Sequence, residues 1–320
     1  MKKLFIAMMA MAAFAACSNE EPVASLQGDA IAFGDAFVDN SVRAIYDDAE
    51  DITGFTVYGN VKGTGAVVAL YDNGATVTRG EAALNEAWSC PVTRYWTPSC
   101  QYNFAAVANH SGATLDAGVP TKIEYTVYAN DPRDLIYGAT TAHTNENGVP
   151  QSGVNTNGVV AFTMNHLLSR VMVSFQNVVE QEDESPYTYA ISNVKIETWE
   201  QGTYTVNPVA PATHWARLND GDATLTFTAP ATEVTKSEPV SAGGAQLVIP
   251  GADVVVSFDY VLKFNGTQIY NNTVSGNVTG LVAGHSYNIT ATLNLNNKIK
   301  FTVADTTDLG WGADTPTTIQ

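Results

Sequence analysis

The chain has 320 residues, with 32 acidic residues against 15 basic ones and a formal net charge of −17. This excess of negative charge repels nucleic acid and anionic lipid surfaces, which argues against nucleic acid as a partner. Charged residues make up only 15% of the chain and hydrophobic residues 45%, so the composition is that of a globular protein and not of a disordered acidic one.

Residues 1–16 have the pattern of an export signal. Two lysines precede an apolar run from Leu4 to Phe14, and small residues follow it. The run is shorter than the about 20 apolar residues that a membrane-spanning helix needs. The small residues directly before Cys17 resemble the lipobox of bacterial lipoproteins, in which the cysteine becomes the acylated first residue of the mature chain. The alternative is plain secretion, with cleavage near Ala16.

Residues 17–43 are predicted to form a lipid-anchored linker and a first strand. Ile31, Phe33 and Phe37 lie on one face of an extended segment, and Asp35 breaks the alternation. Burying three such side chains contributes about 1.5–3 kcal/mol each, so their removal would leave a groove with a strong drive to capture another strand. The alternative is a permanent edge strand.

The rest of the chain is dominated by strand patterns. Several segments combine β-branched and aromatic residues with period-two alternation, and clusters of Gly, Asn, Asp and Pro separate them. No long stretch shows an apolar repeat of 3.6 residues. The pattern predicts an all-β chain of β-sandwich architecture. The strand segments are 123–129, 171–178, 223–229, 253–264 and 286–295.

An acidic run with a proline, VVEQEDESPY at 178–187, interrupts the strand pattern. Such a stretch predicts an exposed connection between two domains. The N-terminal domain would span residues 44–180 and end with the strand that contains Val171, Val173 and Phe175. The C-terminal domain would span residues 186–320.

The last strand pattern of the chain has two interpretations. Ile299, Phe301 and Val303 lie on one face of KIKFTVADTTDLGWG at 298–312. An inserting donor strand requires this alternation, and so does a fixed last strand of the C-terminal sandwich. The fixed strand is slightly favoured.

Known catalytic motifs are absent. The chain has no GxSxG elbow, no HExxH, no phosphate-binding glycine loop and no paired CxxC, so we expect neither an enzyme, nor a metal site, nor a cofactor. Cys90 and Cys100 either close a short loop in an oxidising compartment or stay free as buried thiols. The five tryptophans either fill sandwich cores, the commoner case, or build a sugar-stacking platform. They are Trp88, Trp96, Trp199, Trp215 and Trp311.

Taken together and in order, seven segments resemble the fimbrillin family, the pilus subunits and fimbrillin-like lipoproteins of gram-negative anaerobes. After the lipoprotein start come IAFGDAFVDNSVRA (31–44), ITGFTVYG (52–59), WSCPVTRYWTPSCQYNFAAVAN (88–109), VAFTMNHLLSRVMVSFQN (160–177), AQLVIPGADVVVSFDYVLKFNG (245–266) and VTGLVAGHSYNITATLNLNNKIKFTVADTTDLGW (278–311).

The resemblance implies two transthyretin-like β-sandwich domains and export to the outer membrane as a surface-exposed lipoprotein. In polymerising members an arginine-specific protease removes the first strand, and a strand of the next subunit takes its place. Here the cut would fall between Arg43 and Ala44, unless Arg43 is an ordinary surface residue.

The resemblance implies a non-enzymatic structural or adhesive subunit of fimbriae. Its partners would be other fimbrial subunits and, through the lipid anchor, the membrane; the surface receptor stays open. The alternative function is a monomeric, surface-tethered glycan-binding lipoprotein that uses exposed tryptophans.

Overall fold

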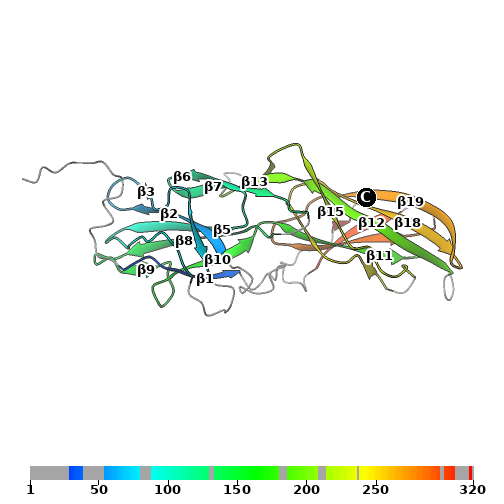
Figure 1. The fold of residues 1–320 in the computed structure, drawn as a ribbon, viewed down its shortest axis with the longest axis horizontal. Coiled ribbons are helices and arrows are strands. Elements are labelled where there is room, and N and C mark those ends of the chain that lie inside the picture. The colour runs from blue at the N-terminus through cyan, green and yellow to red at the C-terminus, as the bar shows by residue number, and fades with distance from the viewer. Residues whose placement is uncertain are drawn as a thin grey trace, which may run out of the picture.

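The computed structural model describes residues 29–38, 54–79, 88–129, 133–179, 186–207, 214–235, 238–295 and 299–306, and the backbone of residues 317–318. Within β1, the side chains of residues 35–38 are not described. This part of the chain contains strands and no helix, and the predicted all-β class is confirmed. The molecule is elongated, and its sheets gather in two halves along the long axis (Figure 1).

One half holds two sheets. The large sheet has the order β1 (Phe33–Val38), β10 (Val160–His166), β8 (Ile136–Thr144), β5 (Gln101–Ala108), β2 (Gly54–Lys62), β3 (Val68–Ala69), with β4 (Ala75–Thr78) paired to β2 and β9 (Pro150–Ser152) paired to β8. The β7 sheet has the order β14 (Trp215–Arg217), β13 (Gln201–Thr205), β7 (Val119–Thr126), β6 (Gly112–Asp116).

The other half also holds two sheets. The β11 sheet has the order β16 (Val240–Ser241), β11 (Ser169–Asn177), β20 (Ser286–Leu293), β21 (Lys300–Asp305), β22 (Thr317–Thr318), with β17 (Gln246–Val248) paired to β11. The β18 sheet has the order β15 (Asp222–Thr226), β12 (Tyr187–Trp199), β18 (Val254–Phe264), β19 (Thr267–Val278).

The strands in each half of the molecule do not all come from one half of the sequence. We expected β11 to be the last strand of the N-terminal sandwich, but it runs parallel to β20, with Val171 opposite Tyr287. In the other direction, β13 follows the acidic run and pairs with β7, with Tyr204 opposite Ile123. Alternation shows that a strand has one buried face but does not select its partner. The domain bounds 44–180 and 186–320 stay a prediction.

Two apolar cores stabilise this arrangement, and they lie on opposite faces of the large sheet. On β5, Phe104 and Ala106 belong to one core, whereas Ala105 and Val107 belong to the other. The second of these cores continues through the β7, β11 and β18 sheets. Both faces of β5 are therefore buried, as in a layered fold. The core that contains Phe104 and Ala106 also includes Ile31 and Phe33 of the N-terminal segment.

Candidate functional site: the first strand and its groove

β1 occupies the end of the large sheet, where it runs parallel to β10. Ala36 lies opposite Phe162, and Val38 lies opposite Met164. The register shifts between Phe33 and Ala36, so the irregularity falls where Asp35 interrupts the apolar alternation. β1 has β10 as its only partner strand in the described part of the sheet, so it can be removed without breaking the rest of the sheet.

The residues just before β1 are bonded on two sides. The N–H of Ile31 donates to the carbonyl of Arg94 (2.7 Å), and the N–H of Trp96 donates to the carbonyl of Asp29 (3.1 Å). On the other side, the N–H of Val160 donates to the carbonyl of Ala32 (2.9 Å). The segment therefore lies in a groove between β10 and residues 94–96, and not on an open edge.

The floor of this groove is aromatic. Phe33 is only 4% exposed, and its ring lies 5.7 Å from that of Phe104, 6.2 Å from that of Phe162 and 6.3 Å from that of Tyr71, measured between centroids. Ile31 is buried in the same core. Two apolar anchors thus seal the groove, and their burial contributes about 1.5–3 kcal/mol each.

The predicted residues of the removable strand are placed only in part. Ile31 and Phe33 come together in the groove, as the alternation suggested. The backbone of Phe37 lies opposite Thr163, but its side chain lies outside the described residues. Cys17, Arg43 and Ala44 also lie outside them. The sequence did not identify Arg94 and Trp96 as part of the groove. They lie in a loop rich in aromatic residues and proline, and this setting was the one signal that pointed to them.

The C-terminal pattern forms a fixed strand in this structure. β21 pairs with β20 along its length, with Phe301 opposite Ala291 and Val303 opposite Ile289. Both side chains are buried in the core, and Ile299 packs against it. Gly276 of β19 leaves room for the Phe301 ring, because a Cβ there would lie 2.4 Å from the ring.

Cys90 and Cys100 are both free thiols, so the disulfide alternative is not formed. The Cys90 thiol donates to the carbonyl of Val92 (3.5 Å), and the Cys100 thiol donates to the carbonyl of Pro98 (3.3 Å). Cys100 is buried, and burial raises the pKa of its thiol. A buried thiol with a raised pKa forms little thiolate and is correspondingly unreactive.

The tryptophans do not assemble into a platform within the described residues. Trp96 is buried in the core under β1, whereas Trp215 is buried in the other core. Trp88 is half-buried against Phe55, Trp199 is half-buried, and Trp311 lies outside the described residues.

The tract NHLLSRV at 165–171 connects the two halves of the molecule. His166 at the end of β10 contacts the fully buried Asp134 through Nδ1 and Oδ2. The Oγ of Ser169, at the start of β11, donates to the carbonyl of Val282 (2.7 Å), and Trp215 Nε1 donates to the carbonyl of Leu167 (3.0 Å). The histidine is therefore structural. These bonds fix the tract where the chain passes from β10 in the large sheet to β11 in the β11 sheet.

A second histidine–carboxylate pair lies elsewhere in the described part of the chain. His285 Nδ1 contacts Asp305 Oδ2 at 2.8 Å, in a second pair near the β20–β21 ladder. No three histidine, cysteine or acidic side chains meet as a metal site within the described ranges. Across the same ranges, no helix is long and apolar enough to cross a membrane.

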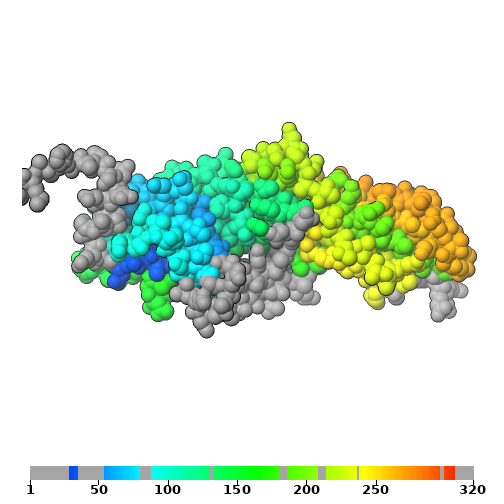
Figure 2. All heavy atoms as spheres, viewed as in Figure 1, coloured from blue at the N-terminus to red at the C-terminus, as the bar shows by residue number. Residues whose placement is uncertain are grey.

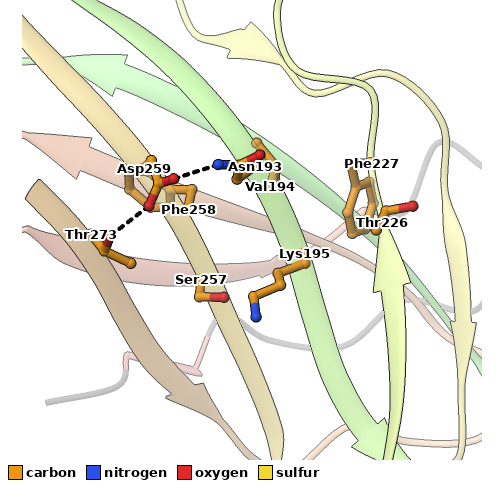
Figure 3. A pocket seen from close by; sticks show the side chains of 9 residues that line it. All are labelled: Asn193, Val194, Lys195, Thr226, Phe227, Ser257, Phe258, Asp259 and Thr273. Atoms are coloured by element: carbon orange, nitrogen blue, oxygen red, sulfur yellow. Dashed lines mark hydrogen bonds between the residues drawn. The ribbon is translucent and has the colours of Figure 1, made fainter.

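A hollow of about 510 Å³ lies on the β18 sheet, where β12 is irregular (Figure 3). Asn193 has φ 51°, and its amide donates to one oxygen of Asp259 while the Thr273 hydroxyl donates to the other, both at 2.5 Å. These donors lower the pKa of the Asp259 carboxyl, with the Thr273 bond the larger cause. Lys195 and Ser257 also line the hollow, together with Val194, Phe227 and Phe258.

Residues 43–305 match a family model described as fimbrillin-like. The chain belongs to the fimbrillin-like family. The match leaves β1 outside, since it begins at Arg43. Membership supports a fimbrial subunit and implies a location at the cell surface.

A solved structure shares the architecture. A fimbrial protein from Bacteroides vulgatus superposes with a TM-score of 0.58 at 15% identity, covering 87% of this chain and 98% of that one. A putative cell adhesion protein from Bacteroides uniformis reaches a TM-score of 0.46 at 17% identity, covering 86% and 97%. The first of these likenesses shows the fold alone. No curated protein matches the chain.

Proposed function

We propose that this fimbrillin-like chain is a non-enzymatic subunit of surface fimbriae, exported as a lipoprotein acylated at Cys17. Cleavage between Arg43 and Ala44 removes the anchor and β1 together. A strand of another subunit then fills the vacated groove by donor-strand exchange. Its partners are other fimbrial subunits, and its location is the outer membrane before cleavage and the fimbria after it.

The observation that carries the proposal is the groove of β1. β1 is an edge element, so its loss leaves the remaining ladders of the large sheet intact. Its loss also opens the aromatic floor formed by Tyr71, Phe104 and Phe162 and frees the backbone of β10. An uncovered apolar groove beside an unpaired strand favours capture of another strand.

The C-terminal strand favours a role as acceptor. Because β21 is paired and buried, its release would open the core around Phe301 and Val303. A subunit that accepts a strand but holds its own last strand suits a terminal or accessory position in a fimbria. The glycan-binding alternative gains no support from the described tryptophans, which are buried or half-buried.

An arginine-specific protease tests the proposal. The purified chain is expected to lose the segment before Ala44, as read by N-terminal sequencing, and then to form ladders resistant to SDS. Arg43→Lys keeps the charge but removes the cleavage site, so it should abolish both effects. Ladders that persist in Arg43→Lys would contradict cleavage at this position.

The groove itself is tested with a peptide of residues 29–38. The peptide should bind the cleaved chain and not the uncleaved one, in which β1 is already seated. A peptide with Phe33→Ala is the matched control, because it lacks the side chain that contacts Phe104 and Phe162. Equal binding of both peptides, or none, would contradict a vacated groove.

Separately, lipidation is tested by labelling cells with a fatty acid. The chain should carry the label, and Cys17→Ser should not. A labelled Cys17→Ser chain would contradict acylation at that residue, without bearing on the groove.

A further inference from the structure

β19 differs from every other strand at the end of a described sheet. It has 12 residues, whereas the other end strands have two to six. β19 pairs with β18 on one side, and no described strand pairs with its other side. Figure 2 shows its region, in orange, at the surface of one end of the molecule, with no other segment drawn over it on this face. A long free edge is a template for pairing with another chain.

The devices that normally protect such an edge are largely missing. TQIYNNTVSGNV contains no charged residue and no proline. A bulge falls at Ile269, but the register then runs without a shift from Tyr270 opposite Leu262 to Val278 opposite Val254. Charge, proline and bulges are the means by which proteins block edge pairing. Nine residues of β19, from Tyr270 to Val278, therefore remain open to it.

The outward backbone groups can be identified from Thr273. Its N–H donates to the side-chain Oδ1 of Asn272 (2.9 Å), so this N–H is not committed to the β18 ladder. Backbone groups alternate between the two sides of a strand, so Asn271, Ser275 and Asn277 direct theirs outward as well. These three residues are exposed, and a new strand would reach their N–H and C=O groups directly.

The charge of the chain limits where two copies can meet. Two copies with a net charge of −17 repel each other over most of their surfaces, and an uncharged strand is where that repulsion is least. In a twofold symmetric antiparallel pair, residue i of one copy lies opposite residue j of the other, and j lies opposite i. A strand without charged residues therefore sets no like charges opposite each other. β19 meets this condition along its whole length.

We propose that β19 is a lateral interface at which two copies of this chain pair antiparallel, edge to edge. Pairing centred near Thr273 sets Asn271 of one copy opposite Ser275 of the other. It joins two four-stranded β18 sheets into one continuous sheet across the contact. The contact uses neither β1 nor the C-terminal strand, so it goes beyond strand exchange and links subunits side by side.

Sedimentation of the purified full mature chain over a range of concentrations tests the interface. We expect a reversible dimer whose population rises with concentration. Ser275→Pro removes an outward N–H while sparing the β18 ladder, and should weaken the dimer at least about tenfold. Ser275→Ala keeps the N–H and should dimerise as the original chain does. An original chain that stays monomeric up to about 1 mM would overturn the proposal.

A second variant keeps the test decisive if the proline disturbs the strand. Asn271→Lys with Ser275→Lys sets like charges opposite each other across the contact, which destabilises a strand pair. It also lowers the net negative charge, so a loss of dimer cannot come from general repulsion. Thr224→Lys with Thr228→Lys makes the same charge change at exposed sites elsewhere and should leave the dimer intact. A dimer that survives the β19 lysines would place the contact on another surface and overturn the proposal.

Discussion

Phe33 stacks against Phe162, with the ring centroids 6.2 Å apart and the planes inclined by 19°. The first ring belongs to β1 and the second to β10, so this contact joins the N-terminal segment to the large sheet. The same side chain meets Phe104 edge-on at 81°. Phe33 is therefore the aromatic anchor of β1, beside the buried Ile31.

Phe33→Ala should destabilise the uncleaved chain by about 3–5 kcal/mol, because it leaves a cavity among aromatic rings. Denaturant unfolding measures the loss. Leu218→Ala is the control, since Leu218 is 46% exposed and should change stability by no more than about 0.5 kcal/mol. Equal effects of the two changes would show that β1 is not part of the cooperative structure.

A fragment of residues 186–320 should not fold alone. It lacks β11, which pairs with β20 through eight residues, and it carries β13 without its partner β7. Thermal circular dichroism is expected to show no cooperative transition. The chain from residue 29 to 320 serves as control and should unfold cooperatively. A cooperative transition in the fragment would mean that the C-terminal sandwich is complete without β11.

His166→Ala should destabilise the chain by about 3–5 kcal/mol, because it leaves Asp134 buried without its partner. Burial raises the pKa of the Asp134 carboxyl, and the bond from His166 opposes that rise. Changing both His166 and Asp134 to leucine should lower the free energy of unfolding by less than the sum of the two single leucine changes. The reason is that no buried charge remains in the double variant. Additive losses in denaturant unfolding would contradict this coupling.

The Asp259 carboxyl should make stability depend on pH in acid. Its pKa lies below the ordinary value of 3.8 in the folded chain, so the folded state favours the ionised form. This contribution is present above the ordinary value and is lost as pH falls through the lowered pKa. The side chain is near water, so it amounts to less than about 1 kcal/mol. Thr273→Val removes the main donor and should raise the pKa, as measured by NMR titration; an unchanged midpoint would contradict this cause.

Both cysteines should be reactive as thiols once the chain unfolds. Alkylation of Cys17→Ser in denaturant is expected to add two labels, and reductant should not alter stability. Under native conditions Cys100 should react more slowly than the half-exposed Cys90, because it is buried. A chain that accepts labels only after reduction would show that the two sulfurs are bonded.

Much of the fold can be predicted from the sequence because alternation is a local property. The pattern of residues 31–33 indicated a buried face, and the structure buries Ile31 and Phe33. The all-β class followed in the same way from strands such as β18 and β20. The candidate site could be predicted only in part, since the groove also depends on residues 94–96.

The sequence by itself determined that the chain is built from strands and which side chains they bury. It also determined that seven segments, taken in their order along the chain, resemble fimbrillins. Only the tertiary structure decided which strands pair, because partners such as Ser174 and Thr290 are 116 residues apart. It decided that Cys90 and Cys100 remain free thiols, that Phe301 is buried in the core of its own chain, and that β19 lies at a sheet edge. Such outcomes depend on how whole sheets pack, and local alternation carries no information about a strand's neighbours.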